Sequence, residues 1–348
     1  MNKRKETIKV RIRDIIIGGN SPVVVQTMTK TDTKDINSTI SQIKQIQQAG
    51  CNLVRVAVPD MEAAEAFKKI RKSVDVALVA DVHFDYRIAI ECIKNKADKI
   101  RINPANIKQK QKIEEIIKAA RDYNTPVRIG LNSGSYKVKI SNPKEKILSQ
   151  AEEYISLFEK HNFNMLVLSA KSSDVNTTID IYQELSQKYK YPLHIGITEA
   201  GPLIEGTIKS ALGIGILLWQ GIGDTIRVSL TSSPVDEVKV GYYILQSLNL
   251  LKYGIDLISC PTCGRCQVNL ISLVSKFEEE IEKRKLQYKN LKVAIMGCEV
   301  NGPGEASSAD IGIAMGKNTG VIFLKGKIIK KVDFENSIKE LISYIEKI

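Results

Sequence analysis

The chain has 348 residues, of which 43% are hydrophobic and 26% are charged. This composition is ordinary for a globular protein and excludes collagen, coiled coil and disorder as the main state. The formal net charge of +12 is compatible with a nucleic acid, a membrane surface, an anionic substrate or an acidic protein as partner. No apolar run approaches the roughly 20 residues that cross a bilayer, and no secretory apolar segment follows the basic N-terminus. We therefore expect a cytoplasmic protein that does not enter a membrane.

Short β-branched and aliphatic runs recur along the first 250 residues or so. They predict eight strands, at 23–26, 52–58, 76–81, 99–103, 127–132, 165–169, 193–198 and 225–229. Between them, apolar residues recur at helical spacing, as at Ile36, Ile40 and Ile43. Eight alternating strand and helix units favour a TIM (β/α)8 barrel over an open doubly wound sheet. The sequence predicts that this barrel occupies residues 1–252.

The pattern changes in the last part of the chain. A strand ending at Cys260 precedes a charged helix over 268–285. Further strands are predicted at 291–297, 310–315 and 321–324, and a closing helix begins near Phe334. These elements predict a small second α/β domain over residues 253–348.

Polar residues lie at the ends of the predicted barrel strands, where the active sites of such barrels are found. The candidates are Gln26, Arg55, Asp81, His83, Arg101, Asn103, Arg128, Asn132, Ser169, Lys171, Glu199, Arg227 and Ser229. Five are cations and two are carboxylates, so the site is expected to bind an anion, and arginine suits bidentate phosphate binding. The alternative for any one arginine is a salt bridge that closes the end of the barrel.

Six cysteines are too few for a disulfide scaffold in a chain of this length. Cys51 and Cys92 lie in apolar contexts and are expected to be packing residues. Cys260, Cys263 and Cys266 fall within seven residues, and Cys298 follows a predicted strand. By spacing alone, these four thiols suit a structural zinc or a [4Fe–4S] cluster equally well. Glu305 follows in a glycine-rich loop, which is either a plain turn or a further source of a ligand.

Several segments carry a resemblance to a known family. They are 25–29, 31–33, 54–59, 80–84, 101–104, 130–135, 198–201, 227–229, SCPTCGR at 259–265 and MGCEVNGPGE at 296–305. The sequence resembles the 4-hydroxy-3-methylbut-2-enyl diphosphate synthases, iron–sulfur enzymes of the methylerythritol phosphate route to isoprenoids, in their two-domain bacterial form. The resemblance spans essentially the whole chain, and the last two motifs are long and specific.

The resemblance implies a [4Fe–4S] cluster held by Cys260, Cys263, Cys298 and Glu305, with Cys266 a neighbour that is not a ligand. It implies the reductive opening and dehydration of 2-C-methyl-D-erythritol 2,4-cyclodiphosphate. The implied substrate-binding residues are Arg55, Arg101, Asn103, Arg128, Asn132, Lys171, Arg227 and Ser229. Glu199 is the expected proton donor, and Asp81 and His83 would hold a substrate hydroxyl or relay a proton. His161 and His194 are expected to be structural.

The implied electron donor is reduced flavodoxin or ferredoxin, an acidic partner that suits a basic chain. In a barrel, each helix returns the chain to the face opposite the strand ends. A final helix of about 16 residues spans roughly 24 Å, whereas the connection over 251–254 reaches at most about 14 Å. We therefore expect a head-to-tail homodimer in which the second domain of one chain covers the barrel of the other.

Two other classes remain open on the residues alone. A basic zinc-binding nucleic-acid module would explain the charge and the cysteines, but the chain lacks a basic patch interleaved with aromatic residues. A barrel enzyme without redox chemistry, such as a pterin-type synthase with a structural zinc, would explain the barrel and its anion site. We expect no nucleic-acid partner.

Overall fold

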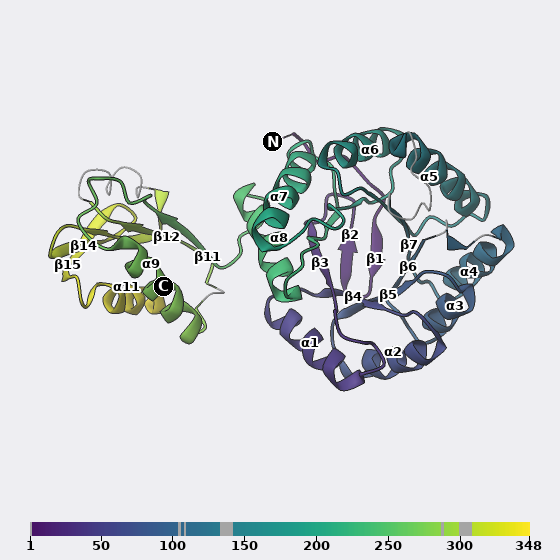
Figure 1. Ribbon diagram of the computed structural model, residues 1–348, viewed down its shortest axis with the longest axis horizontal. Coiled ribbons are helices and arrows are strands. Elements are labelled where there is room, and N and C mark those ends of the chain that lie inside the picture. The colour runs from purple at the N-terminus through teal and green to yellow at the C-terminus, as the bar shows by residue number, and fades with distance from the viewer. Residues whose placement is uncertain (1, 104–105, 108, 133–141, 287–288, 299–307) are drawn as a thin grey trace. The chain divides into compact units, whose positions relative to one another are not determined.

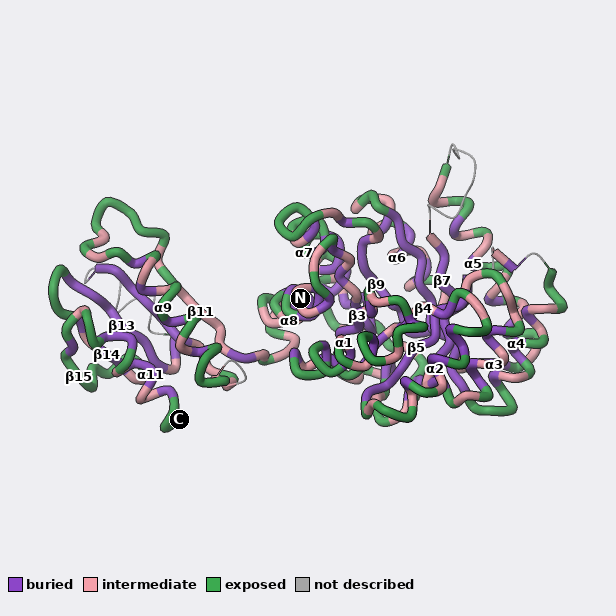
Figure 2. The backbone as a smooth tube through the Cα atoms, turned by 60° about the horizontal axis from the view of Figure 1, so that its bottom comes forward, coloured by how far each residue is buried: buried purple, intermediate pink, exposed green. Residues whose placement is uncertain are grey.

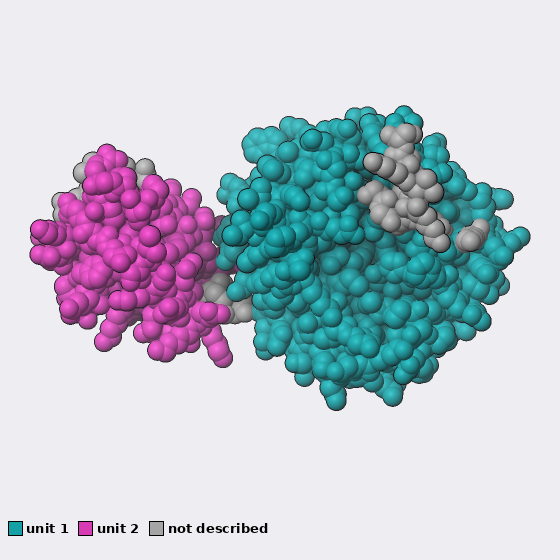
Figure 3. Space-filling view, in the orientation of Figure 1, with its two compact units in different colours: residues 1–251 teal, residues 252–348 magenta. Residues whose placement is uncertain are grey.

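The structure is a computed structural model that describes residues 2–103, 106–107, 109–132, 142–286, 289–298 and 308–348. The chain divides into two compact units, residues 1–251 and residues 252–348, which are distinguished in Figure 3. Each unit has its own apolar core. No helix in the described ranges combines the length and the apolar character that crossing a bilayer requires.

The first unit is a TIM barrel, as predicted. Its strands are β3 (Val24–Met28), β4 (Leu53–Ala57), β5 (Ala77–Val82), β6 (Lys99–Ile102), β7 (Val127–Asn132), β8 (Leu166–Lys171), β9 (His194–Ile195) and β10 (Thr225–Ile226). They pair in parallel in the order β8-β7-β6-β5-β4-β3-β10-β9, and a parallel bridge between Leu168 and Leu193 joins the two ends of this order. The last two strands are shorter than the sequence predicts.

Helices surround the ring of strands (Figure 1). They are α1 (Ile36–Gln48), α2 (Met61–Ser73), α3 (Tyr86–Lys94), α4 (Lys110–Asp122), α5 (Pro143–Lys160), α6 (Val175–Lys188), α7 (Leu203–Trp219) and α8 (Pro234–Ser247). Several begin at a residue whose side chain accepts a hydrogen bond from the first turn, as Asp60 does for α2 and Asp174 for α6. The helices turn apolar stripes inward, and the strands beneath them are buried (Figure 2).

A hairpin that the sequence analysis did not predict precedes the barrel. Its strands are β1 (Val10–Ile12) and β2 (Ile15–Ile17), which pair antiparallel and lie across the centre of the ring in Figure 1. Val10, Ile12 and Ile17 pack against residues near the starts of the barrel strands, including Leu53 and Val79. The hairpin therefore closes the end of the barrel opposite the carboxyl ends of the strands.

The second unit is a mixed sheet covered by two helices among the described residues. Its strands are β11 (Ile255–Ser259), β12 (Leu291–Met296), β13 (Ile311–Met315), β14 (Thr319–Leu324) and β15 (Lys327–Asp333), and its helices are α9 (Leu270–Lys283) and α11 (Ser337–Lys347). The first three strands are parallel and the last two pair antiparallel. The lysine-rich β15 was not predicted, and it forms an edge of the sheet.

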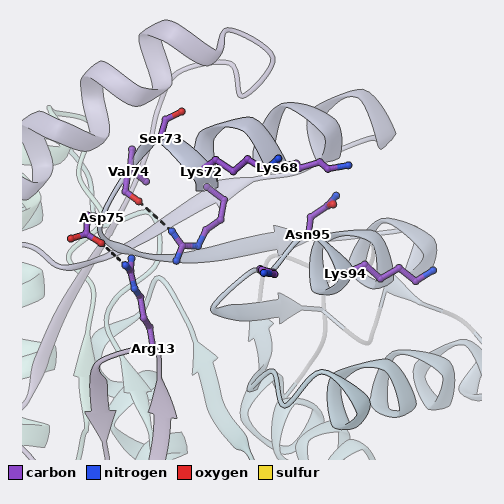
Figure 4. Close-up of a pocket in the computed structure, with 10 residues that line it drawn as sticks. Arg13, Lys68, Lys72, Ser73, Val74, Asp75, Lys94 and Asn95 are labelled. Carbon is purple, nitrogen blue, oxygen red and sulfur yellow. Dashed lines mark hydrogen bonds and ion pairs between the residues drawn. The ribbon is translucent and has the colours of Figure 1, made fainter.

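A surface pocket of about 630 Å³ lies near the ends of α2 and α3 (Figure 4). Four of its ten lining residues are lysines. Its two arginines already have partners: Arg13 pairs with Asp75, and Arg71 donates to the carbonyl of Val74 at 3.2 Å. Cations at the C-terminal end of a helix are favoured by the helix dipole. This stabilising role accounts for the positive charge of the pocket. The pocket lies at the end of the barrel opposite the carboxyl ends of the strands.

Candidate active site

Five cations converge inside the barrel. We name them the barrel cation group: Arg55 on β4, Arg101 on β6, Arg128 on β7, Lys171 on β8 and Arg227 immediately after β10. Arg101 and Arg128 are each 2% exposed and Lys171 is 6% exposed. Burial lowers the pKa of Lys171, and the four arginines of the group lower it further. The structure thus brings these five side chains near one another, and their shared role in one site stays a prediction.

One carboxylate, Asp81 at the end of β5, organises part of this group. Its oxygens lie 3.0 Å from Nη1 of Arg101 and 3.6 Å from Nε of Arg55. His83 Nε2 lies 3.4 Å from Oδ2 of Asp81 and 2.9 Å from Nη1 of Arg101. Burial alone would raise the pKa of Asp81, but the two guanidinium groups hold it well below its usual range. Asp81 is consequently ionised at neutral pH and serves as an acceptor.

A glycine makes room for Arg101. Nη2 of Arg101 donates to the carbonyl of Gly130 at 3.0 Å, and a Cβ at Gly130 would lie 2.4 Å from Nε of the same guanidinium. A side chain at position 130 would therefore displace Arg101. This steric requirement explains a glycine within a barrel strand, where it otherwise weakens the sheet.

The cations exceed the carboxylates available to them. Among the described residues, the ion pairs of the group run to Asp81 and to Glu237, whose Oε2 lies 3.9 Å from Arg227. Burial lowers the pKa of Arg55 to about 9, and burial beside other arginines lowers the pKa of Arg128. An anion placed among these groups would relieve this repulsion.

Unpaired donors point to the same conclusion. Within the described residues, five donor atoms on the barrel strands or directly after them are buried and make no hydrogen bond: Gln26 Nε2, Lys99 Nζ, Arg101 Nε, Arg128 Nε and Arg227 Nε. Buried donors normally have partners, because an unmade hydrogen bond is costly. All five are donors, so the missing partner is an acceptor. A phosphate or diphosphate group supplies several acceptor oxygens.

The remaining predicted residues surround the same strand ends. Asn103 is buried just after β6, Asn132 ends β7, and Ser229 is half-buried after β10. Glu199 follows β9, is exposed, and has a φ of 51°. A left-handed backbone is unfavourable for glutamate, and such strain is concentrated at functional sites.

Three buried polar residues of the barrel were not predicted as site residues. Glu237, on α8, accepts hydrogen bonds from Thr27 Oγ1 at 2.7 Å and from the backbone N–H of Leu230 at 3.0 Å. Lys99 is enclosed at the start of β6, two positions before Arg101, so strand alternation could have identified it. His194, expected to be structural, lies 3.2 Å from the ammonium of Lys171. Glu237 lies on a helix, where no strand alternation marks a residue that faces the barrel interior.

In the second unit, the candidate thiols gather at one edge of the sheet. Cys260 follows β11 directly, and Cys298 lies two residues beyond the parallel neighbour β12. The segment that carries Cys263 is joined to this edge, because the N–H of Gln267 donates to the carbonyl of Gly297 at 3.0 Å. Hydrogen bonds from Arg265 lower the pKa of the exposed Cys263 thiol, which favours the thiolate that binds metals.

Cys266 differs from the other three thiols. Its Sγ donates to the carbonyl of Val268 at 3.2 Å, and a Cβ at Gly297 would lie 2.4 Å from this sulfur. A thiol used as a hydrogen-bond donor and packed beside a glycine is suited to a structural role. That Cys266 is not a ligand stays a prediction.

The donor chemistry of this edge fits an iron–sulfur cluster, because thiolates are its usual ligands. Glu305, the fourth expected ligand, lies outside the described residues. Within the ranges described, no three His, Cys, Asp or Glu side chains are close enough together to hold a metal ion. Three thiols on adjacent loops nevertheless supply the right ligand type on one side of a site.

The two units match the two parts of one family. A family model described as the GcpE TIM-barrel domain matches residues 7–242, and one described as the GcpE protein C-terminal domain matches residues 256–347. Two curated relatives carry the name 4-hydroxy-3-methylbut-2-en-1-yl diphosphate synthase (flavodoxin). That of Ruminiclostridium cellulolyticum is 52% identical over 348 residues, covering 99% of this chain and 98% of the relative. That of Clostridium perfringens is 53% identical over 350 residues, covering 99% of each.

Two solved structures resemble about 70% of the chain. The dihydropteroate synthase of Yersinia pestis has a TM-score of 0.53 and 14% identity, over 70% of this chain and 100% of that chain. The dihydropteroate synthase of Xanthomonas albilineans has a TM-score of 0.51 and 10% identity, over 70% and 99% respectively. Such low identity shows the fold and carries no activity. Because both family models match and the relatives share half of their residues with it over their full length, the chain belongs to the GcpE family.

Proposed function

We propose that this chain is a 4-hydroxy-3-methylbut-2-en-1-yl diphosphate synthase, an oxidoreductase of isoprenoid biosynthesis that acts on 2-C-methyl-D-erythritol 2,4-cyclodiphosphate. The two-electron reduction opens the ring, expels one oxygen as water and leaves the linear allylic diphosphate. The observation that carries this proposal is the barrel cation group with its unpaired buried donors. The barrel cations alone do not distinguish between anions of similar charge. We choose the cyclic diphosphate because the chain belongs to the GcpE family.

The residues of the barrel bind and orient the substrate in this proposal. The five cations neutralise the diphosphate, and Asn103, Asn132 and Ser229 add neutral hydrogen bonds. Asp81 holds Arg101 and Arg55 in place. Together with His83, it accepts a hydrogen bond from a substrate hydroxyl or passes a proton. Glu199 protonates the departing oxygen, since hydroxide is a poor leaving group.

Cys260, Cys263, Cys298 and Glu305 would hold a [4Fe–4S] cluster. When bound, the cluster supplies electrons one at a time and offers an iron with an exchangeable oxygen ligand. Reduced flavodoxin is the proposed electron donor, since the relatives are named for it, and ferredoxin is the alternative. The net charge of +12 favours an acidic carrier, so reduction should slow as salt rises.

The assembly we propose is a head-to-tail homodimer, and an exposed apolar face on α7 supports it. The face is formed by Leu203, Ile204, Ile208, Leu212, Ile216 and Trp219, all of them exposed. Contiguous apolar surface of this kind marks an interaction site. The connection between the units is longer than the four residues expected from the sequence: α8 ends at Ser247, and residues 248–254 could extend about 25 Å.

A mixing experiment tests the composite site of this dimer. Cys298→Ala and Glu199→Gln chains, each inactive alone, are combined under conditions that exchange subunits. Heterodimers would contain one site with both changes and one with neither, so activity should return. If exchange is demonstrated and the mixture stays inactive, each site is built within one chain.

Metal analysis tests the cluster. Protein purified without oxygen should be brown and contain iron and sulfide in comparable amounts. Cys298→Ala should lose most of both, whereas the control Cys92→Ala, in the barrel core, should retain them. A colourless protein with one zinc per chain would contradict the redox function.

A further inference from the structure

Lys171 occupies an unusual position within the barrel cation group. Its side chain is buried, and a Cβ at Gly196 on the adjacent chain segment would lie 2.7 Å from its Nζ. The absence of a side chain at Gly196 therefore leaves the space that the ammonium occupies. A long flexible lysine still needs a partner to hold its end in one place, because each free rotamer costs binding entropy.

His194 is that partner. Its Nε2 lies 3.2 Å from Nζ of Lys171, and its Nδ1 lies 2.8 Å from Oγ1 of Thr225 on β10. The imidazole is fully buried. Burial and the charge of Lys171 lower the pKa of His194, so the ring is neutral at neutral pH. A neutral ring has one donor and one acceptor nitrogen.

The tautomer follows from the partners. A bound anion favours the ammonium form of Lys171, which has only donors. Nε2 of His194 then accepts from Lys171, and the ring proton lies on Nδ1 and is donated to Thr225. The backbone around the pair is fixed by Tyr182 on α6. Its hydroxyl donates to the carbonyl of His194 at 2.6 Å and accepts from the N–H of Ala170 at 3.0 Å. The strands that carry the pair are thus joined by one side chain.

We propose that His194 is a positioning residue for anion binding: it accepts one N–H of the Lys171 ammonium and directs the other two at the substrate diphosphate. This inference rests on the proposed function. The groups that act on Lys171 from neighbouring strands are Arg55, Arg101, Arg128 and Arg227, all cations, and Lys99 faces His194. These cations lower the pKa of Lys171, whereas His194, a neutral acceptor among them, favours the charged form of Lys171 and opposes that lowering.

Two substitutions separate positioning from packing. His194→Gln places a side-chain oxygen near the former Nε2 and keeps the acceptor, whereas His194→Asn keeps a polar group only near the former Nδ1. Binding of inorganic diphosphate to the anaerobically reconstituted enzyme is measured by calorimetry across pH. We expect about tenfold weaker binding for Asn and at most about twofold for Gln. The alkaline loss of affinity should begin at lower pH in Asn, because Lys171 loses an acceptor that favours its protonated form.

Thr225→Val and a spectroscopic measurement guard against misfolding of the Asn variant. Thr225→Val removes the hydrogen-bond partner of the proton on Nδ1 of His194. It should shift the alkaline loss of diphosphate affinity in the same direction by a smaller amount. The chain has three histidines, so nitrogen NMR with diphosphate bound can assign the tautomer of His194, which should carry its proton on Nδ1. A proton on Nε2, wild-type binding in Asn, or equal losses in Asn and Gln would each overturn the inference. Failure of the wild-type enzyme to bind diphosphate would instead overturn the proposed anion site, and this inference with it.

Discussion

Lys99 has an amine enclosed by the barrel and no hydrogen-bond partner among the described residues. Burial lowers its pKa, and Arg128 and Arg55 lower it further. The unfolded chain therefore binds a proton at pH values where the folded chain does not, so stability rises as pH increases toward the ordinary lysine value.

Lys99→Met should accordingly raise the free energy of unfolding by about 1–3 kcal/mol at neutral pH. The gain should shrink as pH approaches 10, where the unfolded lysine also loses its proton. Chemical denaturation at several pH values checks this. A variant that is less stable than the wild type at neutral pH would mean that an unseen partner neutralises the amine.

Glu199→Gln should preserve substrate binding and lower kcat by about 10²–10⁴-fold, because the amide keeps the shape but cannot donate a proton in the same way. Glu115→Gln, a change at an exposed position of α4, is the control and should leave kcat unchanged. Steady-state kinetics with separate measurement of substrate affinity distinguishes the two effects. Unchanged turnover in Glu199→Gln would remove this residue from the mechanism.

At the scale of elements, the β1–β2 hairpin contributes a buried apolar face to the closed end of the barrel. Ile12 is fully buried in that cluster, whereas Ile16 on the same hairpin is exposed. Ile12→Ala should lower the free energy of unfolding by about 2–5 kcal/mol. Ile16→Ala should change it by no more than about 0.5 kcal/mol. Equal effects in urea denaturation would contradict the packing described for the hairpin.

The apolar face of α7 gives a second test at this scale. The double variant Ile208→Glu, Leu212→Glu places two charges on that face and should convert the dimer to a monomer with little loss of helix content. Tyr123→Glu, another exposed position on the barrel, is the control. Sedimentation velocity reports the mass. A wild-type monomer, or a variant that stays dimeric, would exclude this face as the interface.

Two different physical reasons explain why β1, β2 and β15 could not be predicted from the sequence. The β1–β2 strands have three residues each, too short for alternation to be recognised. β15 has the sequence KIIKKVD and is mostly exposed, so its lysines obscure the strand signal. In contrast, the barrel strands are rich in aliphatic residues and buried on both faces, and their few polar positions do not hide the repeated strand signal.

Some residues of the candidate site could likewise be predicted from the sequence, and others could not. The barrel cation group could be predicted because strand ends and side-chain parity place those residues without any knowledge of packing. Glu237 could not, because its contact with Thr27 depends on how α8 packs against β3. The role of His194 depends on the approach of two strands to within hydrogen-bond distance, which only the folded structure reveals.

At the scale of the whole molecule, the chain combines two units with different chemistry. The barrel offers cations and unpaired donors, whereas the second unit offers thiols at one sheet edge. Neither set alone supplies what a reductive ring opening needs: the first suits an anion, and the second suits an electron-transfer centre. In the proposed function, both sets act on one cyclic diphosphate.

The most direct measurement is anaerobic turnover of 2-C-methyl-D-erythritol 2,4-cyclodiphosphate by the reconstituted protein with reduced flavodoxin, followed by mass spectrometry of the product. We expect the linear allylic diphosphate, with one water released for every two electrons consumed, and no product when Arg128→Met replaces the wild type. A reconstituted, iron-containing wild-type protein that leaves the cyclic diphosphate unchanged while flavodoxin stays reduced would contradict the account.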